Sequence, residues 1–229
     1  MLNTPFWFRE NFEVDKGRNL SVAVTDILEV KQSKFQKIEV FQTVSLGKML
    51  VLDGIIQLTE FDNFAYHEMM AHVPLMIHPN PERVLIVGGG DGGVLKEALK
   101  HSCVKEVFLC EIDQDVITVC QKHFPDLSSG YQDPRVTVVI DDAAKFISTK
   151  PDYFDVICVD SSDPIGPALS LFNKKFYENI SKALTEEGIS VSQSESMYFH
   201  AEFIASLYKQ NKEIFPIVDY YYTLIPTYP

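Results

Sequence analysis

The chain has 229 residues, 46% of them hydrophobic, which is enough to bury a core and to form one or two domains. Its net charge of −12 argues against a nucleic acid or an anionic membrane as a partner. No apolar run approaches the roughly 18 residues of a membrane span, and the first residues do not follow the signal-peptide pattern, so we expect a cytoplasmic protein.

Residues 1–62 predict a small all-β domain. Apolar and polar residues alternate in LSVAVTDI, FQKIEVFQTV and KMLVLDGIIQLTE, as in strands with one buried face. In the last of these stretches Asp53-Gly54 stands between two apolar runs, which is a strong signal for a two-residue hairpin turn. A domain this small and strand-rich cannot cover both of its faces, so we expect it to pair with another subunit.

Residues 63–229 predict an α/β domain with a Rossmann-like, doubly wound sheet. The segment AYHEMMAHVPLMI has helical periodicity, which Pro74 interrupts or kinks. Five apolar strands then alternate with helices, which is typical of a parallel sheet covered on both faces; the strands are RVLIVG, EVFLCEID, VTVVID, FDVICVD and GISVSQ. We expect the tyrosine-rich stretch IVDYYYTLIP to form a further strand.

The loop after the first of these strands has the G-x-G-x-x-G spacing of a nucleotide site, with Gly88, Gly90 and Gly93. Asp91 within this loop opposes a pyrophosphate, because like charges about 4 Å apart repel by roughly 4 kcal/mol at an effective dielectric of 20. Glu111 follows Gly88 by 23 residues, where an acid accepts hydrogen bonds from ribose hydroxyls. The expected ligand is therefore a nucleoside with a positive group, such as an S-adenosyl sulfonium, rather than NAD.

Acidic residues follow nearly every predicted strand of this sheet. A single aspartate after a strand is explained by a helix cap, but parallel strands end at one edge of a sheet, where ligands bind. The convergence of so many acids therefore predicts a site for a cation. The residues concerned are Asp91, Glu111, Asp113, Asp141, Asp142, Asp160, Asp163 and Glu195.

Neither the histidines nor the cysteines predict a metal site. His67 and His72 in YHEMMAH are five residues apart, about 140° around a helix, so they cannot share a metal on one face. The four cysteines are irregularly spaced and contain no C-x-x-C pair, which favours buried, reduced thiols.

Seven motifs together resemble the spermidine synthase family of polyamine aminopropyltransferases: LDGIIQLTE, YHEM, GGGDGG, CEID, DSSDPIGPA, SQSES and IPTYP. The resemblance covers almost the whole chain, in the family's order. It implies transfer of the aminopropyl group of decarboxylated S-adenosylmethionine, a co-substrate and not a cofactor, to putrescine, giving spermidine and 5′-methylthioadenosine. It also implies a dimer or tetramer formed through the amino-terminal domain.

The resemblance further assigns roles to individual residues. Asp91 would hold the donor's ammonium and repel the carboxylate of ordinary S-adenosylmethionine, and Asp160 would accept the proton of the attacking amine, or position that amine and relay its proton. The residues assigned to the polyamine and aminopropyl groups are Tyr66, His67, Asp91, Asp160, Ser161, Ser162, Asp163, Gln193 and Tyr228. Those assigned to the methylthioadenosine portion are Gln36, Glu111, Asp142, Ala143 and Pro167.

Several alternatives stay open at this point. A diamine N-methyltransferase that uses S-adenosylmethionine would share the glycine loop, and a truncated, inactive binding protein would keep the pocket. Glu195 is a candidate for the second ammonium of the diamine or else a solvated acid at a strand end. The family's pattern includes a further strand after IPTYP, which this sequence lacks. Neither the preferred diamine nor the choice between dimer and tetramer can be read from the sequence.

Overall fold

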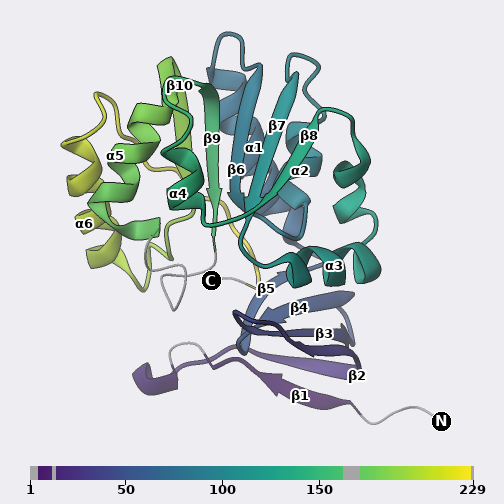
Figure 1. Ribbon diagram of the computed structural model, residues 1–229. Helices are drawn as coiled ribbons and strands as arrows, with labels where there is room; N and C mark the ends of the chain where they lie inside the picture. Colours follow the sequence, from purple (N-terminus) through teal and green to yellow (C-terminus); the bar gives the residue numbers. More distant parts are fainter. Residues whose placement is uncertain (1–4, 12–13, 162–170, 228–229) are drawn as a thin grey trace.

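The computed structural model describes residues 5–11, 14–161 and 171–227, which form two sheets (Figure 1). The amino-terminal sheet is antiparallel. The second sheet is wholly parallel, with helices on both of its faces. The predicted fold class, a Rossmann-like parallel sheet that follows a small all-β unit, is confirmed.

The amino-terminal sheet contains five strands in sequence order: β1 (Phe6–Arg9), β2 (Ser21–Gln32), β3 (Lys37–Thr43), β4 (Lys48–Leu52) and β5 (Ile55–Thr59). A short 3-10 helix, Val14–Lys16, precedes β2. The predicted hairpin joins β4 to β5, and its turn residues Asp53 and Gly54 both have positive φ, 49° and 81°. A type I′ turn requires this conformation at both positions, so the hairpin prediction is confirmed.

Helix α1 (Asn63–Ile77) connects the two sheets, with Pro74 inside its last turn. The elements after it are β6 (Arg83–Gly88), α2 (Gly93–Ala98), β7 (Glu106–Glu111), α3 (Gln114–His123), the 3-10 helix Leu127–Gln132, β8 (Val136–Ile140), α4 (Ala143–Ile147), β9 (Phe154–Asp160), α5 (Lys174–Ala183), β10 (Leu184–Ser192) and α6 (Ala201–Lys212).

The parallel sheet has the strand order β10-β9-β6-β7-β8. The chain runs outward from β6 to β8 and then crosses back to β9, so β6 and β9 are neighbours where the strand order reverses. Ligands of doubly wound sheets bind at the carboxyl ends of the strands at this reversal. The topology therefore places the glycine loop after β6 and Asp160 at the end of β9 at one expected site.

Side chains of the central strands alternate between the two faces of the sheet. In β6, Val84 and Ile86 belong to the core beneath α1 and α2, whereas Leu85 and Val87 belong to the core beneath α4 and α5. All four side chains are at most 1% exposed. Burial on both faces explains why these strands read as continuous apolar runs.

Helix α3 fastens the parallel sheet to the antiparallel one. Its residues Val116, Val119 and Cys120 share a buried cluster with Ile38 and Leu50 of the antiparallel sheet. As a result, the antiparallel sheet lies across the carboxyl ends of the parallel strands (Figure 1). This arrangement encloses the edge where the acidic residues converge.

The prediction of a strand over IVDYYYTLIP is wrong. Residues 216–224 are irregular, and among the described residues no strand pairs with them. A strand needs a neighbour that takes up its backbone hydrogen bonds; here a tyrosine hydroxyl helps to hold the segment, since Tyr221 donates to the carbonyl oxygen of Met69 at 2.9 Å. Tyr220, Tyr221 and Tyr222 are all at least 38% exposed, so their rings do not alternate between core and solvent.

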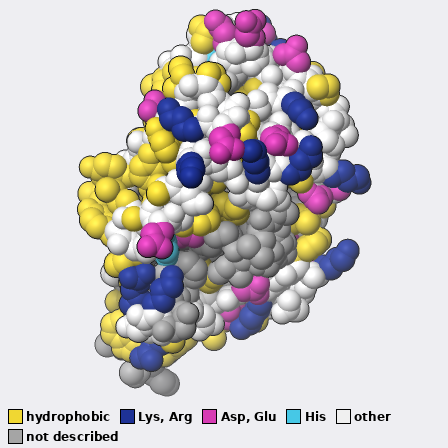
Figure 2. Space-filling model, turned by 90° about the vertical axis from the view of Figure 1, so that its left-hand side faces the viewer, with side chains coloured by type: hydrophobic (Ala, Val, Ile, Leu, Met, Phe, Trp, Pro, Cys, Tyr) yellow, Lys and Arg dark blue, Asp and Glu magenta, His cyan; other side chains and the backbone are white. Residues whose placement is uncertain are grey.

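The face shown in Figure 2 has acidic and basic side chains interspersed over its upper half. Apolar side chains gather along one side of the same view. None of the helices in the described ranges is both long and apolar enough to cross a bilayer.

A pair of glycine substitutions tests the close approach of β6 and β9. Gly88 and Gly17 both have positive φ, 75° and 78°, so alanine is strained at either position. A Cβ at Gly88 would also lie 2.2 Å from the carbonyl oxygen of Asp160, whereas a Cβ at Gly17 meets nothing within 4 Å. We expect Gly88→Ala to lower the free energy of unfolding by roughly 2–3 kcal/mol more than Gly17→Ala, as measured by urea denaturation. Equal losses would contradict the contact.

Candidate functional site

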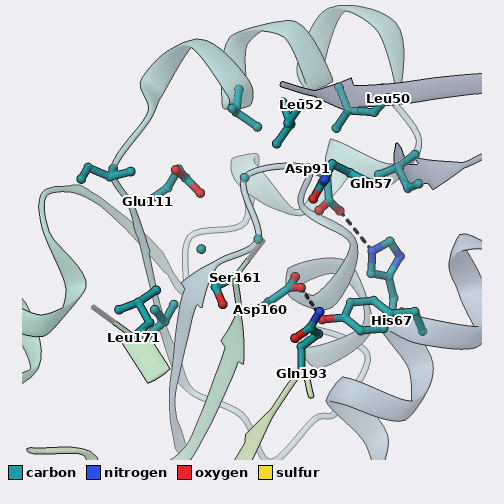
Figure 3. A pocket seen from close by; sticks show the side chains of 18 of the residues that line it. Leu50, Leu52, Gln57, His67, Asp91, Glu111, Asp160, Ser161, Leu171 and Gln193 are labelled. Atoms are coloured by element: carbon teal, nitrogen blue, oxygen red, sulfur yellow. Dashed lines mark hydrogen bonds and ion pairs between the residues drawn. The ribbon is translucent and has the colours of Figure 1, made fainter. Parts of the chain in front are cut away.

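A pocket opens at the carboxyl ends of β6, β7 and β9, and the antiparallel sheet forms its outer wall (Figure 3). Leu50, Leu52 and Leu58 of that sheet give the wall an apolar surface. The opposite side is lined by the polar ends of the parallel strands and by the first turns of α1. The polar side chains that line the pocket are Gln36, Gln57, Asp62, Asn63, Tyr66, His67, Asp91, Glu111, Asp141, Asp142, Asp160, Ser161, Gln193 and Thr227.

The predicted glycines allow three other elements, one by its backbone and two by side chains, to approach the backbone of the loop. A Cβ added at each glycine would collide with a neighbour from β9, β7 or α1. It would lie 2.2 Å from the Asp160 carbonyl oxygen at Gly88, 3.1 Å from Glu111 Oε2 at Gly90, and 2.2 Å from the His67 ring at Gly93. The glycines therefore let the end of β9, the Glu111 side chain and the His67 ring lie close to the loop.

Buried His67 and partly buried Asp91 form a pair in this pocket. His67 Nε2 lies 3.3 Å from Asp91 Oδ1, and the same oxygen accepts a hydrogen bond from the Gly93 amide at 2.7 Å. Burial favours the neutral forms of both groups, but their mutual attraction wins: the pKa of His67 is raised above its ordinary value and the pKa of Asp91 is lowered. The attraction between the two groups thus shifts each pKa toward the charged form.

Asp160 lies in the same pocket, and its pKa is shifted in the opposite direction to that of Asp91. Burial and the nearby charge of Asp91 raise its pKa to about 7, although His67 and a hydrogen bond from Tyr66 oppose the shift. The Tyr66 hydroxyl donates to Asp160 Oδ1 at 2.7 Å. Asp160 Oδ2 is buried and has no hydrogen-bond partner among the described residues. An unused oxygen on a carboxyl group that titrates near neutrality can take up a proton from a bound ligand.

Glu111 and Gln36 lie on the other side of the pocket and are held in place by Asp113. Glu111 Oε1 accepts from the Asp113 amide at 2.8 Å, and burial is the main cause that raises the Glu111 pKa to about 7. The Asp113 carboxylate in turn accepts from Gln36 Nε2 at 3.1 Å and from the Ser33 hydroxyl at 2.6 Å. The two polar side chains thus have fixed directions before any ligand binds.

Asp142 and Ala143 begin the short helix α4 at the edge of the pocket. Asp142 is the helix N-cap, and its Oδ1 accepts from the Ala144 amide at 2.8 Å. Its second carboxylate oxygen is not used by the cap. Ala143 is buried, with 7% of its surface exposed.

Most of the site residues that the sequence predicts line this one pocket: Gln36, Tyr66, His67, Gly88, Gly90, Asp91, Glu111, Asp142, Ala143, Asp160, Ser161 and Gln193. Gly93 stands behind it against the His67 ring. The remaining predicted residues, Ser162, Asp163, Pro167 and Tyr228, lie outside the described residues.

Glu195 does not line the pocket, so the structure does not bring it to the other predicted residues. Its Oε2 lies 3.0 Å from His200 Nδ1, and only 6% of its side chain is exposed. Its side chain is thus paired with a histidine rather than surrounded by solvent.

Four polar pocket residues were not predicted from the sequence: Gln57, Asp62, Asn63 and Thr227. Gln57 is the one amide in the apolar strand sequence IIQLT, and that contrast was an available signal. Asp62 and Asn63 stand at the start of α1, where an aspartate is ordinarily explained as a helix cap. The sequence offered no reason to give them another role.

Two family models match the chain. Residues 63–229 match the spermine/spermidine synthase domain, and residues 6–60 match the spermidine synthase tetramerisation domain.

Individual relatives agree with these models. A polyamine aminopropyltransferase of Leptospira biflexa is 50% identical over 97% of this chain and 79% of its own length. A spermidine synthase of Schizosaccharomyces pombe is 47% identical over 97% of this chain and 75% of its own length.

Solved structures show the same similarity in three dimensions. A spermidine synthase in complex with the transition-state analogue AdoDATO has a TM-score of 0.95 and 38% identity, over 99% of this chain and 78% of that one. The spermidine synthase of Thermotoga maritima has a TM-score of 0.93 and 37% identity, with the same coverage. The chain, with acids converging in a pocket beneath its amino-terminal sheet, belongs to the spermidine synthase family of polyamine aminopropyltransferases.

Proposed function

We propose that this chain transfers the aminopropyl group of decarboxylated S-adenosylmethionine to putrescine, which yields spermidine and 5′-methylthioadenosine. The observation that carries the proposal is the placement of Asp91 and Asp160 in one buried pocket at the reversal of strand order. Both substrates are cations, and the pocket offers two acids where a nucleotide-binding loop would otherwise receive phosphates.

Asp91 selects the donor. Its carboxylate is fixed by the Gly93 amide at 2.7 Å, so a ligand ammonium can bind to it without rearrangement of the loop. Ordinary S-adenosylmethionine would bring a carboxylate close to this charge, and like charges about 4 Å apart cost roughly 4 kcal/mol at an effective dielectric of 20. This repulsion favours aminopropyl transfer over the methyltransferase alternative.

Glu111 and Gln36 hold the nucleoside part of the donor in this proposal. Glu111 Oε2 lies on the side of the glycine loop where a ribose hydroxyl can donate to it. Asp142, through the oxygen not used by the helix cap, accepts from the exocyclic amine of adenine, and the Ala143 amide donates to the ring. Pro167, by family resemblance, covers the nucleoside. No metal and no cofactor takes part in the proposed reaction.

Asp160 acts on the acceptor. One amine of putrescine attacks the carbon bonded to the sulfonium, the carbon–sulfur bond breaks, and its electron pair neutralises the sulfur. The attacking nitrogen must lose a proton, and a carboxyl group with a pKa of about 7 accepts it better than one with an ordinary pKa near 4. Tyr66 orients the carboxyl group, and Gln193 and Ser161 lie beside it in the pocket. Ser162, Asp163 and Tyr228 are assigned to the diamine by family resemblance alone.

The amino-terminal sheet is proposed to join copies of this chain. Apolar side chains remain exposed on β1 and β2, namely Trp7 at 70%, Ile27 at 57% and Val30 at 54%. A matching model named for tetramerisation over residues 6–60 supports this assignment, and light scattering of the whole chain measures it. The four cysteines are free thiols, in keeping with the proposed cytoplasmic location. The proposal includes no nucleic-acid partner and no membrane partner.

The reaction itself is tested by turnover with each donor. We expect decarboxylated S-adenosylmethionine and putrescine to give spermidine and 5′-methylthioadenosine, identified by mass spectrometry. Intact S-adenosylmethionine should give no product, and the rates with a set of longer diamines identify the preferred acceptor. A methylated diamine would instead identify a methyltransferase, and nucleoside binding without turnover would identify an inactive binding protein.

Replacing Asp91 by asparagine tests the choice of donor. Asp91→Asn keeps the size of the side chain but removes the charge that binds the ammonium. By calorimetry we expect decarboxylated S-adenosylmethionine to bind about 10- to 100-fold more weakly, the loss of one hydrogen bond to a charged group. The affinity for 5′-methylthioadenosine, which has no ammonium, should change little. An equal loss for both ligands would refute the assignment.

The proton-accepting role of Asp160 predicts a particular pH dependence. Below its pKa of about 7 the carboxyl group is protonated and cannot accept a proton, so kcat/KM should rise as the pH increases through 7. Asp160→Asn should lower kcat by roughly 10²–10⁴-fold and remove this limb of the profile. Part of the rate should return as the pH nears the amine's own pKa. Near-normal turnover of the variant at neutral pH would contradict the role.

A further inference from the structure

Asp62 occupies the N-cap position of α1 but does not cap the helix. An aspartate at this position ordinarily accepts a hydrogen bond from an amide of the first turn, and the Asp62 side chain makes no such bond. It is nevertheless 97% buried, with 3% of its surface exposed. A buried carboxylate that accepts no hydrogen bond from the amides of its own helix must be stabilised by other hydrogen-bond donors.

The donors come from two segments that are far apart in the sequence. Asp62 Oδ1 accepts from the Thr59 hydroxyl at 2.5 Å, at the end of β5. Asp62 Oδ2 accepts from Thr227 twice, from its amide at 2.9 Å and from its hydroxyl at 2.6 Å. Thr227 is 165 residues away in the sequence and 7% exposed. The carboxylate thus joins the last described residues to the start of α1, and both of its oxygens are occupied.

This junction lies at the wall of the pocket. Residues of both joined segments line the pocket: Asp62 and Asn63 at the start of α1, and Ile225 and Thr227 at the end of the described chain. The next turn of α1 carries Tyr66, whose hydroxyl is bonded to Asp160. The residues that hold the nucleoside in our proposal come from other elements, the loop before β3 and the ends of β7 and β8. The junction therefore belongs to the diamine side.

The segment joined to Asp62 has little secondary structure to hold it. Residues 216–224 are irregular and no described strand pairs with them. Earlier in the segment, the Tyr221 hydroxyl bonds to a carbonyl oxygen of α1. Thr227 is the buried residue at its end.

We propose that Asp62 is a positioning residue that holds residues 225–227 in place as the diamine-side wall of the pocket. The inference rests on the proposed aminopropyl transfer. Asp62 acts through its two bonds to Thr227, not through contact of its charge with the substrate, because Thr59 already donates to one carboxylate oxygen and Thr227 donates twice to the other. Loss of these bonds should weaken binding of the diamine and leave binding of the donor unchanged.

Two substitutions at Asp62 distinguish the effect of losing its hydrogen bonds from the effect of losing its charge. In Asp62→Asn the amide oxygen can still accept both bonds from Thr227, while the amide nitrogen donates to the Thr59 hydroxyl, which is also an acceptor. Asp62→Ala loses all three bonds. We expect the KM for putrescine to rise roughly 5- to 100-fold in Asp62→Ala, as for the loss of hydrogen bonds to a charged group. In Asp62→Asn it should stay within about threefold of the wild-type value, and the affinity for 5′-methylthioadenosine should be unchanged in both variants.

A second pair of substitutions distinguishes a specific effect of the Asp62–Thr227 contact from a general loss of stability. Thr59→Val and Thr227→Val each remove one hydroxyl that donates to the same carboxylate, but only Thr227→Val loosens residues 225–227. We expect the KM for putrescine to rise in Thr227→Val and to remain at the wild-type value in Thr59→Val. An equal rise in both, or a rise in Asp62→Asn as large as in Asp62→Ala, would overturn the proposal.

Hydrogen exchange at the Thr227 amide gives a readout that needs no activity. The amide should exchange slowly in the wild-type chain and in Asp62→Asn, and at least about tenfold faster in Asp62→Ala, because its acceptor is gone. Equal exchange in the wild-type chain and Asp62→Ala would overturn the junction even if turnover is normal. A wild-type chain that makes no spermidine but shows the expected exchange pattern would instead refute the proposed reaction and leave the junction standing.

Discussion

The contact between β6 and β9 at Gly88 is the constraint on which the site depends. Gly88 pairs with Asp160 in the parallel ladder, and the Gly89 amide donates to the Asp160 carbonyl oxygen at 2.9 Å. Because Gly88 has no Cβ, the glycine loop can turn directly against the end of β9. Asp160 therefore shares a buried space with Asp91, which the same loop carries two residues after Gly89. Two acids that are far apart in the sequence become electrostatically coupled.

The two neighbouring acids give the pocket a preference for cations. Burial and the charge of Asp91 raise the pKa of Asp160, while His67 acts in the opposite direction. A cationic substrate placed between the acids would offset it further, since an opposite charge in a buried site favours the ionised carboxylate. Selectivity for an amine and the availability of a proton acceptor thus have the same physical origin.

Helix α1 organises the side of the pocket opposite the nucleoside. Its start bears Asp62, which holds residues 225–227, and its next turn bears Tyr66 and His67, which contact Asp160 and Asp91. One helix thereby connects the end of β9, the glycine loop and the last described segment. The antiparallel sheet, held by α3, closes the pocket from outside (Figure 1).

Local sequence determined the elements whose signals are short-range. The Asp53-Gly54 turn needs only two residues that tolerate positive φ, and continuous apolar strands such as β6 need only burial on both faces. The aspartate in the glycine loop and the family motifs could also be recognised from the sequence alone. Tertiary structure alone decided the rest. Residues 216–224 are not a strand because no described neighbour pairs with them, and Asp62 turns from its own helix to Thr227 because burial leaves its charge in need of donors. Such choices depend on which distant groups the fold brings within hydrogen-bonding distance, and sequence periodicity carries no information about those distances.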